Sequence, residues 1–400
     1  MFAMAEMIRA KESLSFHFAR LPSFRAPKTM RKTKLVKDLI YKIALTRIPL
    51  VGVVTAKVLV SYCGGVREVF EASEKELKKI PGIGDQVAKQ VRREEPLVEA
   101  ERELAFVEQN GLQVLFYLDA EFPQRLKPLA DAPILLYYKG TANLNQRKVL
   151  GVIGTRTPSP HGVGICEEII KGLAPYQPLI VSGLAYGIDV TAHRASLKEG
   201  LETVAVLGHG LQQVYPAQHR SVAMKMISQG GLLTEFTSQE GPAKEHFPMR
   251  NRIVAGMCDG IIVVETALRG GSIITAKQAN GYGRDVFAVP GRVKDKYSQG
   301  CNMMIKKSWA HLLESADDVA RVFGWNLKEG ASDNGQQKLF EELTEPEKKV
   351  IDLIHEAEEI GIDQLSYRSE IGPAELASLL LDLEFKGLVR SLPGKRYVLS

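Results

Sequence analysis

The segment "HFPMRNRIVAG" at residues 246–256 places two arginines and an asparagine between an aromatic-proline pair and an apolar run. The exposed N–H groups of a helix start carry partial positive charge, so an ordinary solvated start favours acidic side chains and a capping residue. Cations at such a start suit a bound anion instead. Arginine can grip phosphate oxygens through two nitrogens, and a ring such as Phe247 can stack on a nucleobase. The segment therefore predicts contact with a ligand that carries phosphates.

Small polar residues and further cations follow the ends of other apolar runs. They are Gly154, Thr155 and Arg156 after "VLGVI", Ser182 and Gly183 after "PLIV", and Ser272 and Lys277 after "IIVVE". Glycine, serine and threonine at helix starts present backbone N–H groups to phosphate oxygens. The cations Arg250, Arg252, Arg269 and Arg292 also fall after strand-like runs, and Asn251 lies between two of them. Several spaced cations with one aromatic residue favour a polymer of phosphates over a single nucleotide.

The familiar nucleotide-binding loops are absent from the sequence. No G-x-x-x-x-G-K-[ST] occurs, which excludes a P-loop NTPase. The segment "VIGTRTPSPHGVG" lacks G-x-G-x-x-G, and the bulky Arg156 stands where a dinucleotide loop needs close backbone approach. We therefore expect neither a nicotinamide nor a flavin cofactor. No metal-ligand cluster or catalytic motif is present either, so we predict a binding protein rather than an enzyme.

These residues need a scaffold that brings strand ends together. The apolar runs "KVLGVIG", "PLIVSG", "TVAVLG", "GLLTEF", "GIIVVE" and "DVFAVPG" alternate with stretches of helical spacing. Short, continuously apolar strands separated by helices indicate a mostly parallel sheet that is covered on both faces. Ligands of such sheets bind beyond the carboxyl ends of the strands. We predict an α/β domain over residues 110–326, with the site at this edge.

The flanking segments have different patterns. Residues 35–108 contain two related units, "IPLVGVVTAKVL" and "IPGIGDQVAKQV", which resemble the helix-hairpin-helix module. Leu50 replaces the first glycine in the earlier unit, which leaves both a DNA-contacting and a protein-docking role open. Residues 327–338 have the composition of a linker, and residues 339–400 predict three helices and a β-hairpin, an order that resembles a winged helix. We expect residues 1–34 to form a basic, disordered extension, or to precede a true start at Met30.

Charge is unevenly distributed along the chain. The whole sequence has a net charge of +5. Residues 147–310 hold 19 Lys/Arg and 12 Asp/Glu, a balance of +7, whereas residues 330–400 hold 8 and 14, a balance of −6. A polyanion would therefore bind the middle of the chain. The four cysteines lie far apart, which favours free thiols in a reducing compartment. No apolar run has the length of a membrane span, so we expect a cytoplasmic protein.

Six ordered motifs resemble the DNA-processing protein A (DprA, also called Smf) family. They are "VIGTRTPSPHGVG", "IVSGLAYGIDVTAHRASL", "TVAVLGHGLQQVYP", "FPMRNRIVAG", "VVETALRGGSIITAKQA" and "DVFAVPG". The resemblance implies an extended Rossmann-like domain that binds single-stranded DNA, protects it and helps to load the RecA recombinase during natural transformation. It also implies a homodimer. It assigns the single-strand pocket to Gly154, Arg156, Phe247, Asn251 and Lys277, with Arg250 and Arg252 in support.

One alternative is a nucleotide-processing or nucleotide-sensing Rossmann-like enzyme. Asp189 and His193 are four residues apart, so a helix would place them on one face as a possible acid–base pair. We interpret them as a helix cap and a packing residue. Glu265 ends a strand much as a catalytic acid does in phosphoribohydrolases, but "ALRGGSIITAKQ" lacks the second acid of their P-G-G-x-G-T-x-x-E loop. We expect Glu265 to orient Arg250 or Arg252 instead.

Overall fold

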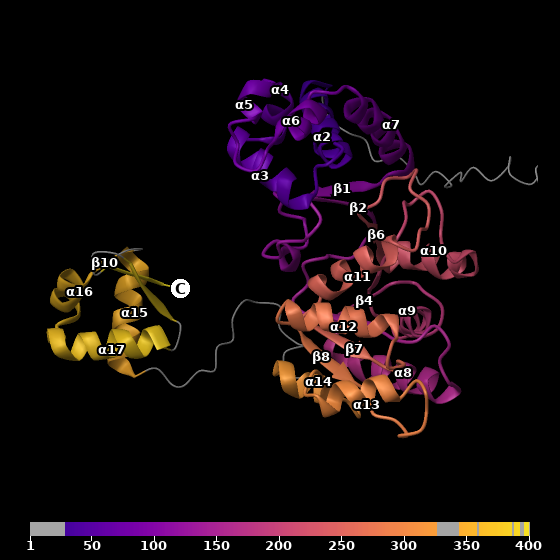
Figure 1. The fold of residues 1–400 in the computed structure, drawn as a ribbon. Coiled ribbons are helices and arrows are strands. Elements are labelled where there is room, and N and C mark those ends of the chain that lie inside the picture. The colour runs from indigo at the N-terminus through magenta and orange to yellow at the C-terminus, as the bar shows by residue number, and fades with distance from the viewer. Residues whose placement is uncertain (1–28, 326–343, 358–359, 386–387, 393–395, 400) are drawn as a thin grey trace, which may run out of the picture. The chain divides into compact units, whose positions relative to one another are not determined.

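A computed structural model describes residues 29–325, 344–357, 360–385, 388–392 and 396–399. The chain divides into two compact units, residues 1–329 and residues 330–400 (Figure 1). Most of the expected N-terminal extension and all of the expected linker lie outside the described residues. The first helix, α2 (Thr29–Arg47), begins before the expected domain start at residue 35.

Helices form the first part of the larger unit. They are α2, α3 (Val53–Cys63), α4 (Val66–Glu71), α5 (Glu74–Leu77), α6 (Asp85–Val91) and α7 (Glu95–Asn110). The two hairpins turn at Leu50 and Gly82, whose φ angles are 66° and 81°. A residue with a Cβ pays about 1–2 kcal/mol for this left-handed conformation, so Leu50 adopts the glycine backbone at a cost.

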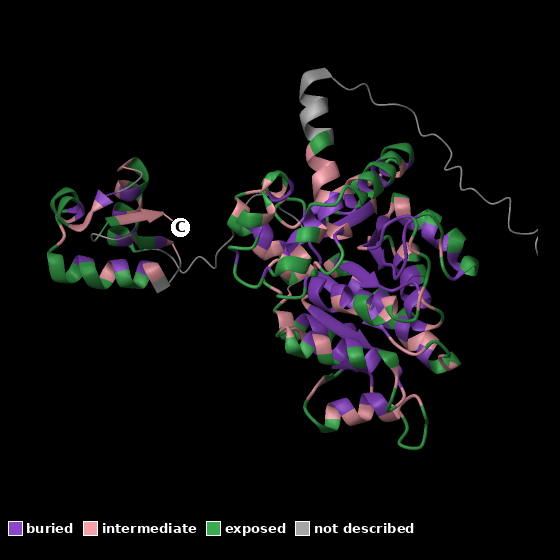
Figure 2. Ribbon diagram, turned by 45° about the horizontal axis from the view of Figure 1, so that its top comes forward, coloured by how far each residue is buried: buried purple, intermediate pink, exposed green. Residues whose placement is uncertain are grey.

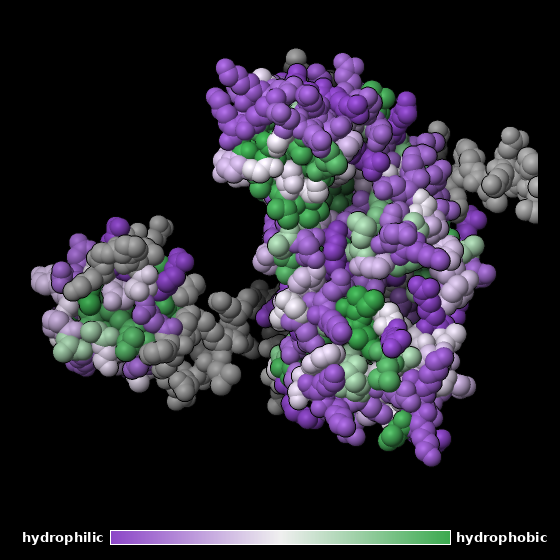
Figure 3. All heavy atoms as spheres, in the orientation of Figure 1, coloured by the Kyte–Doolittle hydropathy of each residue, from purple (hydrophilic) through white to green (hydrophobic). Residues whose placement is uncertain are grey.

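The surface beside the first hairpin is apolar. Leu50 and Val54 are 64% and 59% exposed, and Figure 3 shows hydrophobic residues gathered where α3 lies. In the second hairpin, Lys78 pairs with Glu74 and Asp85. The two hairpins therefore share a backbone layout but present different surfaces.

A nine-stranded sheet follows, in the order β1-β2-β6-β5-β4-β3-β7-β8-β9. Its strands are β1 (Gln113–Phe116), β2 (Leu135–Gly140), β3 (Val149–Ile153), β4 (Leu179–Ser182), β5 (Thr203–Val206), β6 (Gly230–Thr234), β7 (Gly260–Val263), β8 (Asp285–Ala288) and β9 (His311–Leu312). Strands β3 to β9 run parallel to one another, whereas β2 pairs antiparallel with β6, and β1 pairs antiparallel with β2. The predicted mostly parallel sheet is confirmed; the two-residue β9 was not foreseen.

Helices cover both faces of this sheet (Figure 1). One face packs against α8 (Pro160–Leu173), α9 (Ile188–Lys198) and α14 (Ala316–Phe323). The other packs against α11 (His246–Met257), α12 (Gly271–Gly281) and α13 (Gln299–Lys306), while α10 (Arg220–Ser228) packs beside β6. Figure 2 shows the buried residues concentrated in the strands, as continuously apolar strands require.

The smaller unit has the predicted winged-helix order. It contains α15 (Glu345–Ala357), β10 (Ile360–Gly361), α16 (Ile362–Ser369), α17 (Pro373–Phe385), β11 (Val389–Leu392) and β12 (Arg396–Leu399). The three strands pair in the order β10-β12-β11. Val350, Leu365, Leu380 and Val389 belong to its own apolar core.

The state of the cysteines and the lengths of the helices agree with what the sequence predicted. All four cysteines are free thiols, and Cys166, Cys258 and Cys301 are buried, as predicted. Burial raises the pKa of Cys166 to about 12. Among the described residues, no helix is both long and apolar enough to span a membrane.

Candidate functional site

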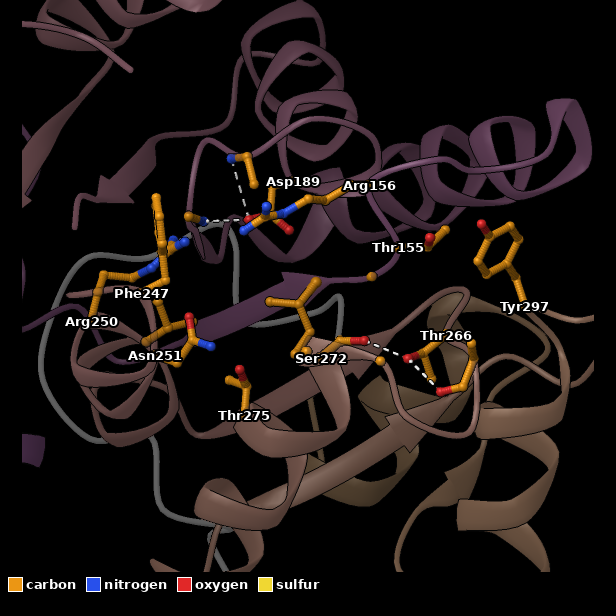
Figure 4. Close-up of a pocket in the computed structure, with 18 residues that line it drawn as sticks. Thr155, Arg156, Asp189, Phe247, Arg250, Asn251, Thr266, Ser272, Thr275 and Tyr297 are labelled. Atoms are coloured by element: carbon orange, nitrogen blue, oxygen red, sulfur yellow. Dashed lines mark hydrogen bonds between the residues drawn. The ribbon is translucent and has the colours of Figure 1, made fainter. Parts of the chain in front are cut away.

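The order in which the strands are added to the sheet reverses at β3. From β3 the chain proceeds outward through β4, β5 and β6, and it then returns to place β7 on the other side of β3. The loops after β3 and β7 therefore diverge to opposite faces and leave a crevice at the carboxyl edge. A cavity of about 230 Å³ lies there (Figure 4). Its lining includes Gly154, Thr155, Arg156, Gly183, Asp189, Phe247, Arg250, Asn251, Thr266, Ser272, Thr275 and Tyr297.

The loop after β3 is held in place by close backbone contacts. The Thr155 N–H donates to the Glu265 carbonyl at 2.7 Å, and the Thr155 carbonyl accepts from the Ile188 N–H at 3.2 Å. Gly187 has φ 77°, and a Cβ there would lie 2.2 Å from the Thr155 carbonyl oxygen. The tight loop therefore depends on glycine. It leaves the Arg156 side chain exposed, with its guanidinium carbon 5.4 Å from the Phe247 ring centroid.

A buried arginine forms the back of the cavity. Arg250 is only 4% exposed, and one of its terminal nitrogens donates to the Val206 carbonyl at 3.0 Å. Its Nε has no hydrogen-bond partner among the described residues. A Cβ on Gly183 would lie 1.4 Å from Arg250 Nη1, so glycine makes room for the guanidinium. Burial lowers the pKa of Arg250, while the nearby Asp189 opposes that shift.

Asp189 has a different role from the helix cap that we expected. It lies inside the first turn of α9, and its Oδ2 accepts from the backbone N–H groups of Gly183 and Ala185, at 3.2 and 3.4 Å. It therefore holds the loop that precedes the helix. Burial raises the pKa of this carboxyl, and Arg250 counteracts the rise. The aspartate thus supports both the loop and the buried cation.

The cations of α11 do not lie in its first turn, contrary to our interpretation of the segment. The helix begins at His246, so Arg250 and Asn251 fall in its second turn and point into the cavity from the side (Figure 4). Phe247 forms part of the cavity wall. A small second cavity of about 50 Å³ adjoins this wall and is lined in part by His209 and Tyr215.

The N-terminus of α12 forms another wall of the cavity. Gly270 precedes the helix, and Ser272 and Thr275 line the cavity from its first turns. The Ser272 hydroxyl donates to Thr266 Oγ1 at 2.7 Å. The start of α12 supplies partial positive charge to the cavity, so a negative ligand group would be favoured at this wall.

Three predicted site residues lie outside the cavity lining. The Ser182 hydroxyl is buried and donates to the Val152 carbonyl at 2.6 Å. Arg252 pairs with Glu235 and donates to the Asp131 carbonyl. Lys277 is exposed, with its ammonium 5.3 Å from the Trp309 ring centroid. The structure thus gathers the other predicted binding residues but not these three.

Glu265 and His193 have structural partners. The Glu265 carboxylate accepts from the Ser159 N–H at 2.9 Å and from the Ser159 hydroxyl at 2.6 Å, at the start of α8. The expectation that it orients Arg250 or Arg252 was therefore wrong. His193 is fully buried, and its Nδ1 lies 2.7 Å from Thr203 Oγ1, which confirms that it packs in the core.

Sequence reasoning missed Tyr297 and Thr266. Both line the cavity, and the Thr266 N–H donates to the Tyr297 carbonyl at 2.6 Å. Thr266 directly follows Glu265 at the carboxyl end of a predicted strand, so its position in the sequence could have marked it as a site residue. Tyr297 lies in the loop between β8 and α13, where no motif marked it.

Comparison with known proteins assigns each part of the chain. The family model described as DNA recombination-mediator protein A matches residues 113–324. The models described as helix-hairpin-helix motif and DprA winged helix domain match residues 43–93 and 338–395. These matches confirm the predicted types of the central and flanking segments.

Individual relatives agree with these matches. DNA processing protein DprA of Streptococcus pneumoniae is 43% identical over 206 residues, covering 52% of this chain and 72% of the relative. Protein Smf of Synechocystis is 29% identical over 390 residues, covering 89% and 98%. The X-ray structure of DprA from Streptococcus pneumoniae superposes with a TM-score of 0.62 at 34% identity, covering 70% of this chain and 97% of that one. With a family match over more than half of its length, the chain belongs to the DNA recombination-mediator protein A family, also known as DprA or Smf.

Proposed function

We propose that the protein binds single-stranded DNA at the carboxyl edge of its large sheet and acts as a recombination mediator. The observation that carries this proposal is the pairing of the exposed Arg156 with Phe247 at the mouth of a cavity backed by the buried Arg250. Arginine can bind a phosphate while the ring stacks on a neighbouring unpaired base. Duplex DNA offers no unpaired base for such a ring.

The size of the cavity favours a polymer. At about 230 Å³ it is smaller than the roughly 300–1,000 Å³ of sites that enclose a drug-sized ligand. The cavity has room for one part of a nucleic-acid strand, and the rest of the strand would lie across the surrounding surface. The balance of +7 over residues 147–310 would attract that remainder.

The family resemblance extends the proposal to partners. The bound strand would be protected and passed to the RecA recombinase in the cytoplasm, and two copies of the chain would act together as a homodimer. Light scattering of the purified protein tests the dimer. Acceleration of RecA filament formation on strands pre-bound by this protein tests the transfer.

Titration of a labelled oligothymidine, followed by anisotropy, tests the binding itself. Arg156→Glu should nearly abolish binding, whereas Lys171→Glu, at the far end of α8, should leave it close to the wild type. Lys277→Glu tests the contribution that the resemblance assigns to that residue. Unchanged affinity in Arg156→Glu would refute the site, and preference for a duplex of equal length would refute single-strand binding.

A further inference from the structure

A second aromatic residue lies at the end of the cavity opposite Phe247. Figure 4 shows Tyr297 on one side of the cavity and Phe247 with Arg156 on the other. Tyr297 is half-buried and comes from the loop of residues 290–298 between β8 and α13. The cavity therefore has a ring at each end.

The position of Tyr297 is fixed by contacts to two other loops. Its hydroxyl accepts a hydrogen bond from Thr157 Oγ1 at 2.7 Å. Its carbonyl accepts from the Thr266 N–H at 2.6 Å. Tyr297 thus joins the loops that follow β3 and β7, the two strands that flank the crevice, and its ring is held at the rim before any ligand arrives.

The base of the loop is closed by further contacts. The side chain of Asn302 donates to the Gly291 carbonyl at 2.8 Å and accepts from the Gly291 N–H at 3.1 Å. A Cβ on Gly291 would lie 2.2 Å from Ser298 Oγ, so the two ends of the loop touch. Backbone bonds from Ser298 and Gln299 to the Asp295 carbonyl complete the turn. The loop is preorganised, which lowers the entropy cost of binding.

The tip of this loop carries exposed cations. Arg292, Lys294 and Lys296 are all exposed, against one acidic residue, Asp295. The Lys296 ammonium lies 5.4 Å from the Tyr297 ring centroid. Within the part of the chain that the structure describes, none of the three has an ion-pair partner. By contrast, Arg252 pairs with Glu235.

We infer that the loop of residues 290–298 is a second contact for the DNA strand, with Tyr297 stacking on a base that leaves the cavity and Lys294 and Lys296 binding the following phosphates. The inference rests on the proposed single-strand binding and gives the strand a path, from Phe247 across the cavity to Tyr297. Tyr297 lines the cavity, and the cations of its loop lie beside it. A strand that occupies the cavity can therefore reach them directly, which favours DNA over an acidic protein surface as the ligand of this loop.

The charge contribution can be measured with a length series. Oligothymidines of about 4 to about 16 nucleotides span the site sizes of single-strand binding modules. Each phosphate contact on a single strand contributes about 0.7 to the slope of log K against log salt, or about fivefold in affinity at about 0.1 M salt. The double variant Lys294→Gln/Lys296→Gln should therefore match the wild type on the shortest oligomers. On longer ones it should lose up to about 25-fold in affinity and about 1.4 in slope.

The control removes two cations elsewhere. Lys171→Gln/Lys198→Gln makes the same charge change at the C-terminal ends of α8 and α9, which lie at the opposite edge of a parallel sheet. It should bind every length nearly as the wild type does. An equal loss in both double variants would mean that only net charge matters, and it would overturn the inference.

Substitution of the tyrosine separates stacking from structure. Tyr297→Leu should weaken binding by about 5- to 150-fold, the range of one lost stacking contact. Tyr297→Phe keeps the ring but loses the hydroxyl contact to Thr157, and it should retain most of the affinity. Equal losses in both variants would overturn the stacking role.

The experiments distinguish a failure of this inference from a failure of the proposed function. If Arg156→Glu abolishes binding while Lys294→Gln/Lys296→Gln binds all lengths as the wild type does, the strand does not cross this loop and the proposed function stands. If the wild-type protein binds no single-stranded oligomer of any length, the proposed function fails, and this inference fails with it.

Discussion

The Arg156 guanidinium carbon lies 5.4 Å from the centroid of the Phe247 ring, although 91 positions separate the two residues in the chain. Arg156 comes from the loop after β3, and Phe247 from the first turn of α11. Gly154 and Gly187 hold the arginine loop against its neighbours, because a Cβ on either would collide with atoms of Ile188 or Thr155. The distance between Arg156 and Phe247 therefore depends on how the arginine loop and the first turn of α11 are packed.

The contact between Arg156 and Phe247 should couple their contributions to binding. An exposed cation–π pair is worth about 0.5–1 kcal/mol. In a double-mutant cycle with Arg156→Gln and Phe247→Leu, the two losses of single-strand binding free energy should therefore depart from additivity by about that amount. Anisotropy titrations of the four proteins measure the coupling. Strict additivity would show that the residues bind the strand independently.

Gly183 should tolerate no side chain, because a Cβ there would lie 1.4 Å from Arg250 Nη1. Gly183→Ala should lower the free energy of unfolding by about 1–3 kcal/mol, as overpacking does, and should weaken single-strand binding. Gly164→Ala is the matched control, since its Cβ would meet no atom within 4 Å in the interior of α8. It should be neutral or stabilising by up to about 1 kcal/mol. Chemical denaturation gives both values, and equal effects would contradict this role of Gly183.

Glu265 should matter for stability rather than for binding or turnover. Its carboxylate accepts two hydrogen bonds from Ser159 at the start of α8. Glu265→Gln leaves one acceptor oxygen where the carboxylate has two, so one of the two charge-assisted hydrogen bonds from Ser159 is lost or reversed, and the variant should cost about 1–3 kcal/mol of unfolding free energy. Affinity for single strands should be retained where the variant is folded. Release of base from nucleoside monophosphates by the wild type, lost in Glu265→Gln, would instead favour a phosphoribohydrolase-like activity.

His193 should make the protein less stable in acid. Burial, with smaller effects from Arg250 and His219, lowers its pKa from 6.5 to about 3. The unfolded chain therefore binds a proton that the native state excludes, and stability is lost as the pH falls below 6.5. This loss approaches about 1.4 kcal/mol per pH unit. Relative to the wild type, His193→Asn should become more stable as the pH falls from about 6 to about 4. Parallel stability curves for the two proteins would contradict a neutral, buried His193.

Leu50 should gain stability from replacement by glycine. It is 64% exposed and holds a φ of 66°, a conformation that costs a residue with a Cβ about 1–2 kcal/mol. Leu50→Gly removes this cost but adds freedom to the unfolded chain, which offsets about 0.5–1 kcal/mol. We expect a net gain of up to about 1 kcal/mol in the unfolding free energy. The corresponding change at Leu59, which is fully buried in α3, should destabilise strongly.

The fold was predictable because its strands are short, apolar and flanked by glycine. The strands β3 to β8 all coincide with apolar runs visible in the sequence, and a parallel sheet places their carboxyl ends along one edge. Arg156, Gly183 and Phe247 lie close together because each comes from a segment that lies at this edge. The two-residue β9 carries no such run, and its pairing with β8 is set by tertiary contacts.

The partners of individual polar side chains could not be predicted in the same way. Glu265 binds Ser159 across 106 positions, and Tyr297 binds Thr157 across 140. Such pairs depend on how far each loop projects beyond the sheet, which residue types and spacing leave undetermined. Arg252 shows the same limit, because its charge faces Glu235 rather than the cavity.

The reversal of strand order at β3 has a thermodynamic consequence. The cavity takes its walls from loops on both sides of that strand, so it exists only when both halves of the sheet are folded. A bound strand must therefore stabilise the two halves as one cooperative unit, by about 2.7 kcal/mol at a ligand concentration 100 times the dissociation constant. Amide hydrogen exchange should slow together in β4 and β7, on either side of β3, once DNA fills the site.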